Sequence, residues 1–303
     1  MAKSSKAKVV FSCFFKQKGV YFFSRLVLLA MEENMSIIQE TIKNSKKIVI
    51  KIGSNVLSND EGSVDKNVLL NIVEQVKELM DDNKQVVIVT SGAGICGVGA
   101  INKWNRRQDM HYKQALCAIG QVELMIAYRE YFWNYGIHVG QLLLTRDDFD
   151  DKNNRRLYIR NTLFTLVDEG IVPIINENDS VSVEEIKIGD NDTLSALTAN
   201  LWNADTLIIL SDIDGVFDCD PKSNSNAKLI EEVHDIDGLV HEIDMHGKSS
   251  FGTGGIVTKI EAARKVNELG INMILLNGLK SDIVRKAHAG EAKGTVFFGK
   301  SGR

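Results

Sequence analysis

Residues 46–58 read KKIVIKIGSNVLS, an apolar run that carries a lysine near its end and is followed at once by glycine and serine. The β-branched residues of 46–52 predict a strand buried on both faces. A lysine inside such a strand is costly unless its ammonium group meets an anion. Lys51 is therefore a candidate ligand for an anion, and Gly53 with the amides after it could hold phosphate. A strand-end lysine that reaches water remains the alternative.

Similar short runs recur along the chain and alternate with segments of helical periodicity. Alternation of this kind is typical of a parallel sheet with helices on both faces. The predicted strands are 46–52, 85–91, 138–145, 171–176, 205–211 and 271–277, and the predicted helices are 65–82, 111–134, 155–169, 192–202 and 255–269. The alternating segment 181–189 predicts a hairpin beside the sheet, and 294–299 predicts a last edge strand. No repeat or proline-rich linker interrupts this pattern, so we expect one α/β domain over 46–303.

Composition excludes several classes of protein. The chain has 303 residues, 44% of them hydrophobic, and a net charge of -4, which is typical of a globular protein without a basic field for nucleic acid. The four cysteines form no CxxC pair, so neither a zinc site nor a disulfide framework is predicted. We expect a reducing cytoplasm and no nucleic-acid or membrane partner.

The first 45 residues differ from the rest. Their apolar run is interrupted by Lys16, Lys18 and Arg25, so it lacks the roughly 18 uninterrupted apolar residues of a membrane span. No small-residue cleavage site follows it. We interpret 1–45 as an extension outside the fold, either disordered or a consequence of a start codon assigned upstream of Met31 or Met35.

Residues 90–99, TSGAGICGVG, contain Gly92, Gly94 and Gly97 in the spacing GxGxxG. That spacing fits the pyrophosphate turn of a dinucleotide-binding oxidoreductase. The fingerprint also expects an acidic residue at the end of the next strand, and 111–120 is neither acidic nor strand-like. The same glycine spacing is also explained by a turn whose backbone amides bind an anion other than a dinucleotide.

Two polar clusters, NEND and GDND, lie within 174–198. They lack the spacing of a calcium loop. Turns alone could account for them, with Asn191 or Asp192 capping the helix that follows.

A fourth motif lies in 249–263, where glycines precede a helix whose first turn carries Thr258 and Lys259. Amides at a helix N-terminus and a lysine suit phosphate, although a glycine loop that only ends a preceding element is the alternative. Two lysines with glycine-rich loops at strand ends suit phosphoryl transfer, in which positioning and neutralisation of charge supply most of the catalysis.

These motifs together resemble the glutamate 5-kinases of the amino acid kinase family. The resemblance rests on KIVIKIGSNVLS, VVIVTSGA, GIHVGQLLLT, IVPIINENDSV, IKIGDNDTLSA, SDIDGVFDCDP and GTGGIVTK, which follow one another between about 46 and 300. It implies a three-layer αβα sandwich with a mainly parallel sheet and a hairpin over the substrate site. It also implies a glutamate-binding lobe at 46–203 and an ATP-binding lobe at 204–303.

The resemblance implies phosphorylation of the side-chain carboxylate of L-glutamate by ATP with Mg²⁺, the first step of proline biosynthesis. The catalytic residues would be Lys51, Asp192 and Lys259, with Asp192 orienting both lysines. Glutamate would be held by Ser91, Gly92, Ala93, Asp179 and Asn191. ATP would be held by Lys51, Ser211, Asp212, Thr253, Gly254, Gly255, Ile256, Val257, Thr258 and Lys259. No protein side chain is assigned to the metal.

The chemistry of the substrate agrees with these roles. A γ-carboxylate is ionised at neutral pH, so the nucleophile needs no general base, whereas two anionic substrates need cations. Asp179 suits the substrate ammonium, and Asn191 could donate to a carboxylate or accept from the ammonium.

The chain departs from the family pattern at Gly94, usually aliphatic, and at Ile256, usually methionine. The sequence ends with GTVFFGKSGR (294–303), so neither a PUA domain nor a reductase domain is expected. The resemblance further implies a homo-oligomer, feedback by proline and channelling of product to glutamyl phosphate reductase. Alternatives are an amino acid kinase with another acidic substrate and a non-enzymatic amino-acid sensor, although the three catalytic positions are intact.

Overall fold

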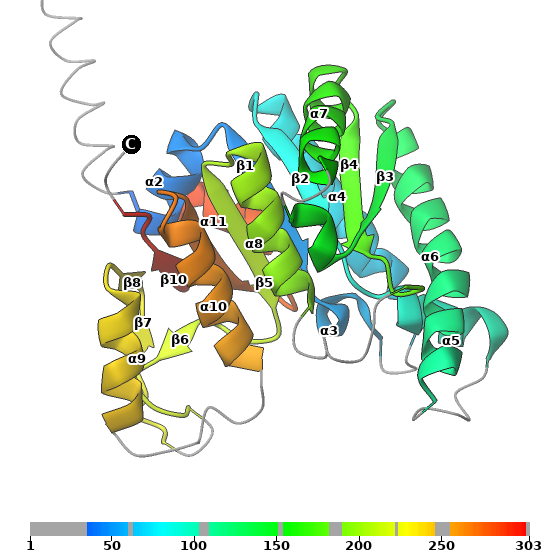
Figure 1. The fold of residues 1–303 in the computed structure, drawn as a ribbon. Helices are drawn as coiled ribbons and strands as arrows, with labels where there is room; N and C mark the ends of the chain where they lie inside the picture. The colour runs from blue at the N-terminus through cyan, green and yellow to red at the C-terminus, as the bar shows by residue number, and fades with distance from the viewer. Residues whose placement is uncertain are drawn as a thin grey trace, which may run out of the picture.

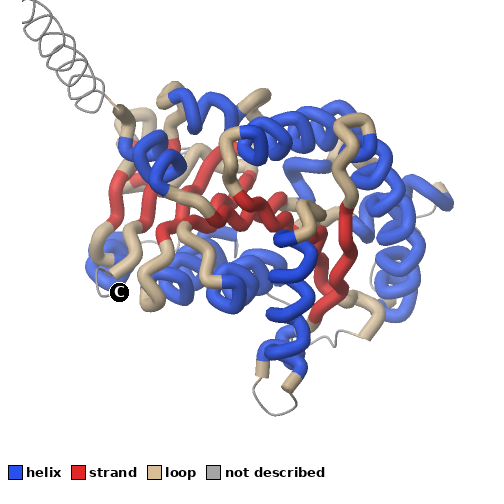
Figure 2. Tube along the Cα trace, turned by 90° about the horizontal axis from the view of Figure 1, so that it is seen from above, coloured by secondary structure: helices blue, strands red, loops and turns tan. Residues whose placement is uncertain are grey.

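A mainly parallel sheet forms the middle layer of the molecule (Figures 1 and 2). The computed structural model describes residues 35–59, 63–102, 109–150, 154–181, 190–221, 224–245 and 255–300. The order of the eight strands described in this sheet is β3-β4-β2-β1-β5-β9-β10-β8. Their bounds are Lys47–Ile52 (β1), Gln85–Val89 (β2), Val139–Leu144 (β3), Val172–Glu177 (β4), Thr206–Ser211 (β5), Glu232–Val233 (β8), Asn272–Asn277 (β9) and Gly294–Phe297 (β10).

Helices cover both faces of the sheet, as Figure 2 shows from above. One face is covered by α2 (Ile37–Asn44), α4 (Lys66–Asp81), α6 (Met110–Trp133) and α11 (Ile283–Ala289). The other is covered by α7 (Arg155–Asp168), α8 (Asp190–Trp202) and α10 (Gly255–Asn267). The other described elements are α3 (Ser54–Leu57), α5 (Ala93–Ile101), η1 (Arg146–Phe149), α9 (Ile236–Met245) and the strand pair β6 (Val216–Phe217) and β7 (Leu229–Ile230).

The central strand β1 contributes to two hydrophobic cores. Ile48, Ile50 and Ile52 pack in the core beneath α2, α4 and α6, whereas Val49 packs in the core beneath α8 and α10. Successive side chains of a strand point to opposite faces, so Lys51 points to the same face as Val49. The strand pattern therefore directs the lysine toward the layer of α8 and α10.

The predicted three-layer α/β fold is confirmed, and each predicted strand and helix corresponds to an observed element. The segment 294–299 also forms a strand, but the prediction that it is an edge strand is wrong. β10 lies between β9, with which it is antiparallel, and the two-residue strand β8, which is the edge. Two residues carry too little periodicity to be recognised in a sequence. The predicted hairpin falls mainly on 182–189, outside the described residues.

The predicted boundary at residue 45 is also wrong, because α2 belongs to the fold. Ser36 caps the helix by accepting a hydrogen bond from the Gln39 amide at 3.2 Å. Ile38 and Ile42 are buried in the core beneath α11 and β10. Residues 1–34 lie outside the described part of the chain. Within that part, no helix is both long and apolar enough to cross a membrane.

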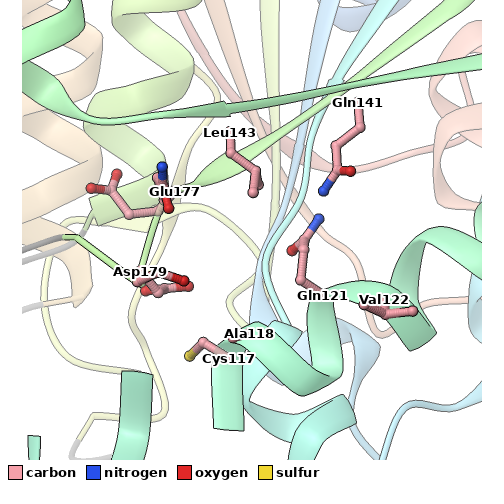
Figure 3. A pocket seen from close by; sticks show the side chains of 10 residues that line it. Cys117, Ala118, Gln121, Val122, Gln141, Leu143, Glu177 and Asp179 are labelled. Atoms are coloured by element: carbon pink, nitrogen blue, oxygen red, sulfur yellow. The ribbon is translucent and has the colours of Figure 1, made fainter. Parts of the chain in front are cut away.

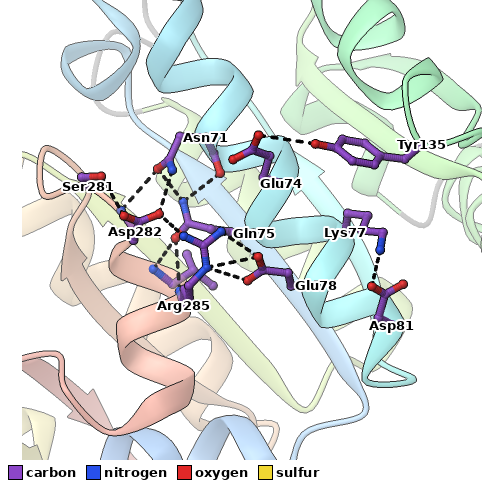
Figure 4. A network of polar contacts seen from close by, with 11 residues as sticks. Asn71, Glu74, Gln75, Lys77, Glu78, Asp81, Tyr135, Ser281, Asp282 and Arg285 are labelled. Atoms are coloured by element: carbon purple, nitrogen blue, oxygen red, sulfur yellow. Dashed lines mark hydrogen bonds and ion pairs between the residues drawn. The ribbon is translucent and has the colours of Figure 1, made fainter.

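A polar network joins α4 to the start of α11 (Figure 4). The buried side-chain carbonyl of Gln75 accepts hydrogen bonds from the amides of Val284 and Arg285, at 2.8 and 3.2 Å. The first amides of a helix have no partner within it, so Gln75 serves as a cap supplied by a neighbouring helix. Asn71 binds Asp282, and Arg285 pairs with Glu78. This network fixes the C-terminal part of the chain against its N-terminal part.

Candidate active site

The candidate site lies at the edge of the sheet where parallel strands end. The first turns of α8 and α10 lie at the same edge (Figure 1). Lys51 is near the end of β1, Ser91 follows β2, Asn176 is near the end of β4, and Ser211 ends β5. These four strands are adjacent and parallel, so their carboxyl ends meet at one edge. Open α/β sheets bind their ligands at this edge.

Two lysines converge on one carboxylate at the centre of this edge. Lys51 Nζ lies 2.6 Å from Asp192 Oδ1, and Lys259 Nζ lies 3.2 Å from Asp192 Oδ2. All three side chains are buried, with at most 8% of any residue exposed. Two ammonium groups against one carboxylate leave one positive charge in excess. A buried excess cation is costly on its own, so the group is suited to an anionic ligand.

The pKa of Asp192 lies below its usual range. Burial alone would raise this pKa, but attraction to Lys51 and Lys259 and the hydrogen bonds from Lys51 and Thr258 outweigh that effect. The predicted role of Asp192 in orienting both lysines therefore has a direct geometric basis. Its predicted role as a helix cap is wrong, because α8 begins at Asp190 and Asp192 lies inside the first turn.

The start of α10 supports the carboxylate from the other side. Thr258 donates to Asp192 Oδ2 at 2.8 Å, and Lys259 Nζ also donates to the carbonyl of Gly255 at 2.9 Å. The side chain of Ile256 is buried in the core, while that of Val257 is half exposed. Thr253 and Gly254 lie outside the described residues. The ATP contacts of this segment stay a prediction.

Beside Lys51, β5 ends in two residues predicted to bind ATP. Ser211 Oγ donates to Asp212 Oδ1 at 3.1 Å, and Asn55 Nδ2 donates to Asp212 Oδ2 at 2.9 Å. Burial would raise the pKa of Asp212, but these two hydrogen bonds keep it below its usual value. Asn55 is a site residue that sequence reasoning missed, since only its place soon after β1 could have indicated it.

Gly53 allows β1 and β5 to approach closely at this end. A Cβ atom there would lie 3.3 Å from the carbonyl oxygen of Leu210 and 3.7 Å from Lys51 Nζ. The amide of Gly53 donates to that same carbonyl at 3.1 Å, so it is not free to bind phosphate as the sequence suggested.

The turn after β2 brings Ser91 to the site. Gly92 precedes α5 with φ of 100°, a left-handed conformation that favours glycine, and Ala93 is buried. Ser91 Oγ accepts a hydrogen bond from Asn191 Nδ2 at 2.8 Å, which places two predicted glutamate ligands in contact.

The GxGxxG spacing has a packing explanation. A Cβ atom on Gly97 would lie 2.0 Å from the carbonyl oxygen of Leu116, so the glycine lets α5 lie directly against α6. From the other side, a Cβ atom on Gly120 would lie 1.8 Å from the carbonyl oxygen of Ala93. Two helices, α5 and α6, then precede the next strand, β3, which is unlike a dinucleotide-binding unit. The structure therefore does not favour the oxidoreductase alternative.

A chain of side-chain amides extends from Asn191 away from the lysines. Asn191 Nδ2 also donates to Asn176 Oδ1 at 3.1 Å, and Asn176 Nδ2 donates to Gln121 Oε1 at 2.8 Å. Asn176 and Gln121 are buried. Neither was predicted as a site residue, although Asn176 belongs to the INEND motif. The signal for Gln121 is its place on α6, which only the fold reveals.

Asp179 lies in the turn after β4 and lines a cavity of about 250 Å³. Figure 3 shows the residues around this cavity, among them Cys117, Gln121, Gln141 and Glu177. Burial raises the pKa of Asp179, and a hydrogen bond from the Cys117 thiol opposes the rise. Burial likewise raises the pKa of the Cys117 thiol to about 12, so this thiol is protonated near neutral pH. A partly buried carboxylate of this kind suits a cationic ligand such as an ammonium group.

Comparison with protein families agrees with this geometry. Residues 46–277 match the model of the amino acid kinase family. The chain is 61% identical over 261 residues to glutamate 5-kinase of Alkaliphilus oremlandii, an alignment that covers 86% of this chain and 99% of that protein. It is 45% identical to glutamate 5-kinase of Geobacter metallireducens, over 85% of this chain and 69% of that protein.

Solved structures agree on the fold. UMP kinase from Bacillus anthracis superimposes with a TM-score of 0.59 at 19% identity, over 85% of this chain and 97% of that chain. An isopentenyl phosphate kinase superimposes with a TM-score of 0.56 at 17% identity, over 83% of this chain and 99% of that chain. At these identities the likeness concerns the three-layer architecture.

Proposed function

This chain belongs to the amino acid kinase family, and from that premise we propose that it acts as a glutamate 5-kinase. It transfers the γ-phosphoryl group of ATP to the side-chain carboxylate of L-glutamate, giving L-glutamyl 5-phosphate and ADP. The observation that carries this function is the buried group of Lys51, Asp192 and Lys259 at the strand ends. The high identity to named glutamate 5-kinases supports the substrate.

In the reaction, a carboxylate oxygen of glutamate attacks the γ-phosphorus while the bond from that phosphorus to the β,γ-bridging oxygen breaks. The attacking carboxylate is already ionised at neutral pH, so no proton is transferred and no general base is required. Negative charge accumulates on the transferring group and on the leaving ADP. We assign neutralisation of that charge to Lys51 and Lys259.

Asp192 keeps the two lysines at a fixed separation before the substrates arrive. Its two oxygens bind different lysines, so both ammonium groups are oriented by one rigid group. Groups oriented in advance need no reorganisation during the reaction, which is the main source of electrostatic catalysis. Thr258 holds the same carboxylate and is therefore a positioning residue rather than only an ATP ligand.

We propose that Mg²⁺ would bind together with ATP, held mainly by the phosphates. The described residues contain no group of three or more His, Cys, Asp and Glu side chains that could cage a metal. Mg²⁺ is commonly held by substrate phosphates and water with one or two carboxylates. When bound it would supply positive charge to the phosphates, and Asp212, whose pKa is lowered beside Ser211, is the side chain that would accept hydrogen bonds from its bound water.

Five further expectations form part of this proposal. The glutamate lobe is 46–203 and the ATP lobe is 204–303, although one sheet runs through both. The enzyme is expected to form a homo-oligomer, to respond to proline and to pass its product to glutamyl phosphate reductase. A reducing, cytoplasmic compartment is supported by the three described cysteines, all of which are free.

Incubation with ATP, Mg²⁺, L-glutamate and hydroxylamine tests the function. Hydroxylamine converts an acyl phosphate to a hydroxamate, whose iron complex is coloured. We expect hydroxamate with L-glutamate, and none when ATP is omitted. Product from L-aspartate or another acid in place of L-glutamate would contradict the substrate and favour the alternative of a different acidic substrate.

A further inference from the structure

The orientation of the amide chain is fixed by a backbone group. The amide N–H of Glu177 points to a side-chain atom of Asn176 at 2.9 Å, and since an N–H only donates, that atom is the oxygen Oδ1. The other atom of Asn176 is then the nitrogen Nδ2, a donor, so the atom of Gln121 that it meets is the oxygen Oε1. Side-chain amides are often ambiguous in orientation, but here each is determined by its neighbour.

The same reasoning fixes Asn191. Its side chain meets the oxygen of Asn176, so it presents Nδ2 to that residue and to Ser91. The amide chain therefore ends in a free donor, Gln121 Nε2, and a free acceptor, Asn191 Oδ1. Both atoms are buried and have no hydrogen-bond partner within the described structure. Unpaired buried polar atoms are costly, and this pair adjoins Ser91 and Asp179, two residues assigned to glutamate, so it suits a polar ligand.

Gln121, which carries the free donor, lines the same cavity as Asp179. Gln121 is only 8% exposed and is supplied by α6, while Gln141 is supplied by the edge strand β3. Figure 3 shows the amide nitrogens of Gln121 and Gln141 turned toward one another across the cavity. An acceptor placed between two donors would satisfy both. The carboxylates of Asp179 and Glu177 lie on another side of the same cavity.

We propose that Gln121 binds the α-carboxylate of the amino-acid substrate and makes the enzyme selective for acids that carry one. In this arrangement Asn191 Oδ1 and Asp179 take the α-ammonium, and Asn176 is a positioning residue that sets the direction of both amides. The donor at one end and the acceptor at the other match the two opposite charges of an α-amino acid. The inference rests on the proposed function, since it concerns the same substrate.

The structure therefore decides a choice that the sequence leaves open. Asn191 could donate to a carboxylate or accept from an ammonium, but its donors are already used by Ser91 and Asn176. Only its oxygen remains for the substrate, so Asn191 accepts.

The decisive variant is Gln121→Glu. It keeps an oxygen for Asn176 and nearly the same shape, but it replaces the donor that faces the cavity by an anionic oxygen. We expect the KM for L-glutamate to rise about ten- to a hundredfold, which is the effect of losing a hydrogen bond to a charged group. The KM for ATP should change by less than about threefold, because none of the residues assigned to ATP lines this cavity.

Two analogues separate recognition of the α-carboxylate from a general loss of structure. Glutarate keeps both carboxylates and lacks the ammonium, whereas 4-aminobutyrate keeps the ammonium and lacks the α-carboxylate. In Gln121→Glu the inhibition constant of glutarate should rise with the KM for glutamate, while that of 4-aminobutyrate should not rise. Asn134→Asp adds the same charge at the exposed end of α6 and should change none of these values.

Calorimetric titration with L-glutamate reads binding without turnover, so the two proposals can fail separately. A native protein that binds L-glutamate but gives no hydroxamate refutes the proposed kinase function, and the Gln121→Glu titration still tests the present inference. An unchanged affinity of Gln121→Glu for L-glutamate, or equal weakening of 4-aminobutyrate and glutarate, overturns the role of Gln121. A conservative variant, Gln121→Met, removes both polar atoms and should weaken glutamate without repelling it, so its KM should lie between the native and Gln121→Glu values.

Discussion

At the scale of single residues, the site depends on how one carboxylate is shared. Asp192 binds two lysines and a threonine while only 2% exposed. Its lowered folded pKa means that it stabilises the protein at pH values above its unfolded pKa, near 4, and that this stability is lost as the pH falls through the folded pKa. At the pH of catalysis Asp192 is therefore ionised and both lysines are held.

Replacement of Lys259 by methionine removes one of the two cations and keeps most of the side-chain volume. We expect kcat to fall by a factor on the order of 10² or more, because the lost charge acts on the transition state. The KM for glutamate should change far less. Steady-state kinetics check this, with circular dichroism to show that the variant is folded. A kcat within threefold of the native value would remove Lys259 from the assigned role.

The raised pKa of Asp179 predicts that the ionised carboxylate lowers the stability of the fold while it favours binding of the substrate. A carboxyl group whose pKa is higher in the folded state destabilises the fold when it is ionised, above that pKa. The penalty disappears as the pH falls below the unfolded value, near 4, where the group is protonated in both states. Asp179→Asn should therefore raise the Tm at pH 7, by roughly 2–4 °C for a gain of about 1 kcal/mol.

The same variant should weaken binding of L-glutamate, since the ammonium loses its anion. Thermal melts at pH 7 and pH 4 without ligand, together with calorimetry at pH 7, measure both effects. A Tm of Asp179→Asn below the native value at pH 7 would show that the carboxylate is paired in the free protein rather than kept for a ligand.

At the scale of elements, the sequence predicts whatever leaves a repeated local pattern. The strands of the central sheet are short β-branched runs, and α4 has a regular apolar face, so both are found by periodicity alone. α2 is missed because it follows an irregular apolar segment, and its burial depends on contacts with α11 and β10 that lie about 250 residues away in the chain. The position of β10 inside the sheet is missed for a similar reason, since β8 is two residues long.

The candidate site likewise contains residues that sequence motifs indicate and residues that only the fold reveals. Lys51, Asp192 and Lys259 were assigned through motifs and meet in the structure as expected. Gln121 lies outside every motif, and Asn55 is indicated only by its place soon after β1, so the sequence alone does not single them out. Gln121 becomes a candidate only once α6 is placed against β4, where Asn176 lies.

The helix pair α5 and α6 gives a test of the glycine motif. Gly97→Ala places a methyl group 2.0 Å from the Leu116 carbonyl, so the helices must separate. We expect a loss of about 1–3 kcal/mol in the free energy of unfolding, as for other overpacked sites. Chemical denaturation with urea measures it.

Gly94→Ala is the matched control on the same helix. The nearest atom to its added methyl group is Cys117 Sγ, at 3.4 Å, so the space is adequate. Alanine is the better helix former by roughly 0.5–1 kcal/mol, and the variant should be as stable as the native protein or more stable. Equal losses for both variants would contradict the packing explanation of the GxGxxG spacing.

At the scale of the whole molecule, one side of the protein exposes an apolar stripe. Ile119, Val122, Ile126 and Trp133 recur on α6 at helical spacing, and between 37% and 61% of each is exposed. The adjacent strand β3 is an edge of the sheet and exposes Leu143, which lines the cavity together with Val122. The opposite stripe of α6, with Leu124 and Tyr128, is buried in the core. The helix is thus apolar on two sides, and the described part of the fold covers only one of them.

An exposed apolar stripe beside an edge strand is typical of a surface that pairs with another subunit. We therefore place the proposed homo-oligomer contact on α6 and β3.

Val122→Asp should lower the molar mass measured by light scattering after size-exclusion chromatography, because a desolvated charge opposes association. Val257→Asp is the matched control, since Val257 is similarly exposed but lies on α10. Loss of association in both variants, or in neither, would move the contact elsewhere. Because Val122 lines the same cavity as Gln121, Val122→Asp should also raise the KM for L-glutamate. The KM for ATP should not change, since none of the residues assigned to ATP lines that cavity.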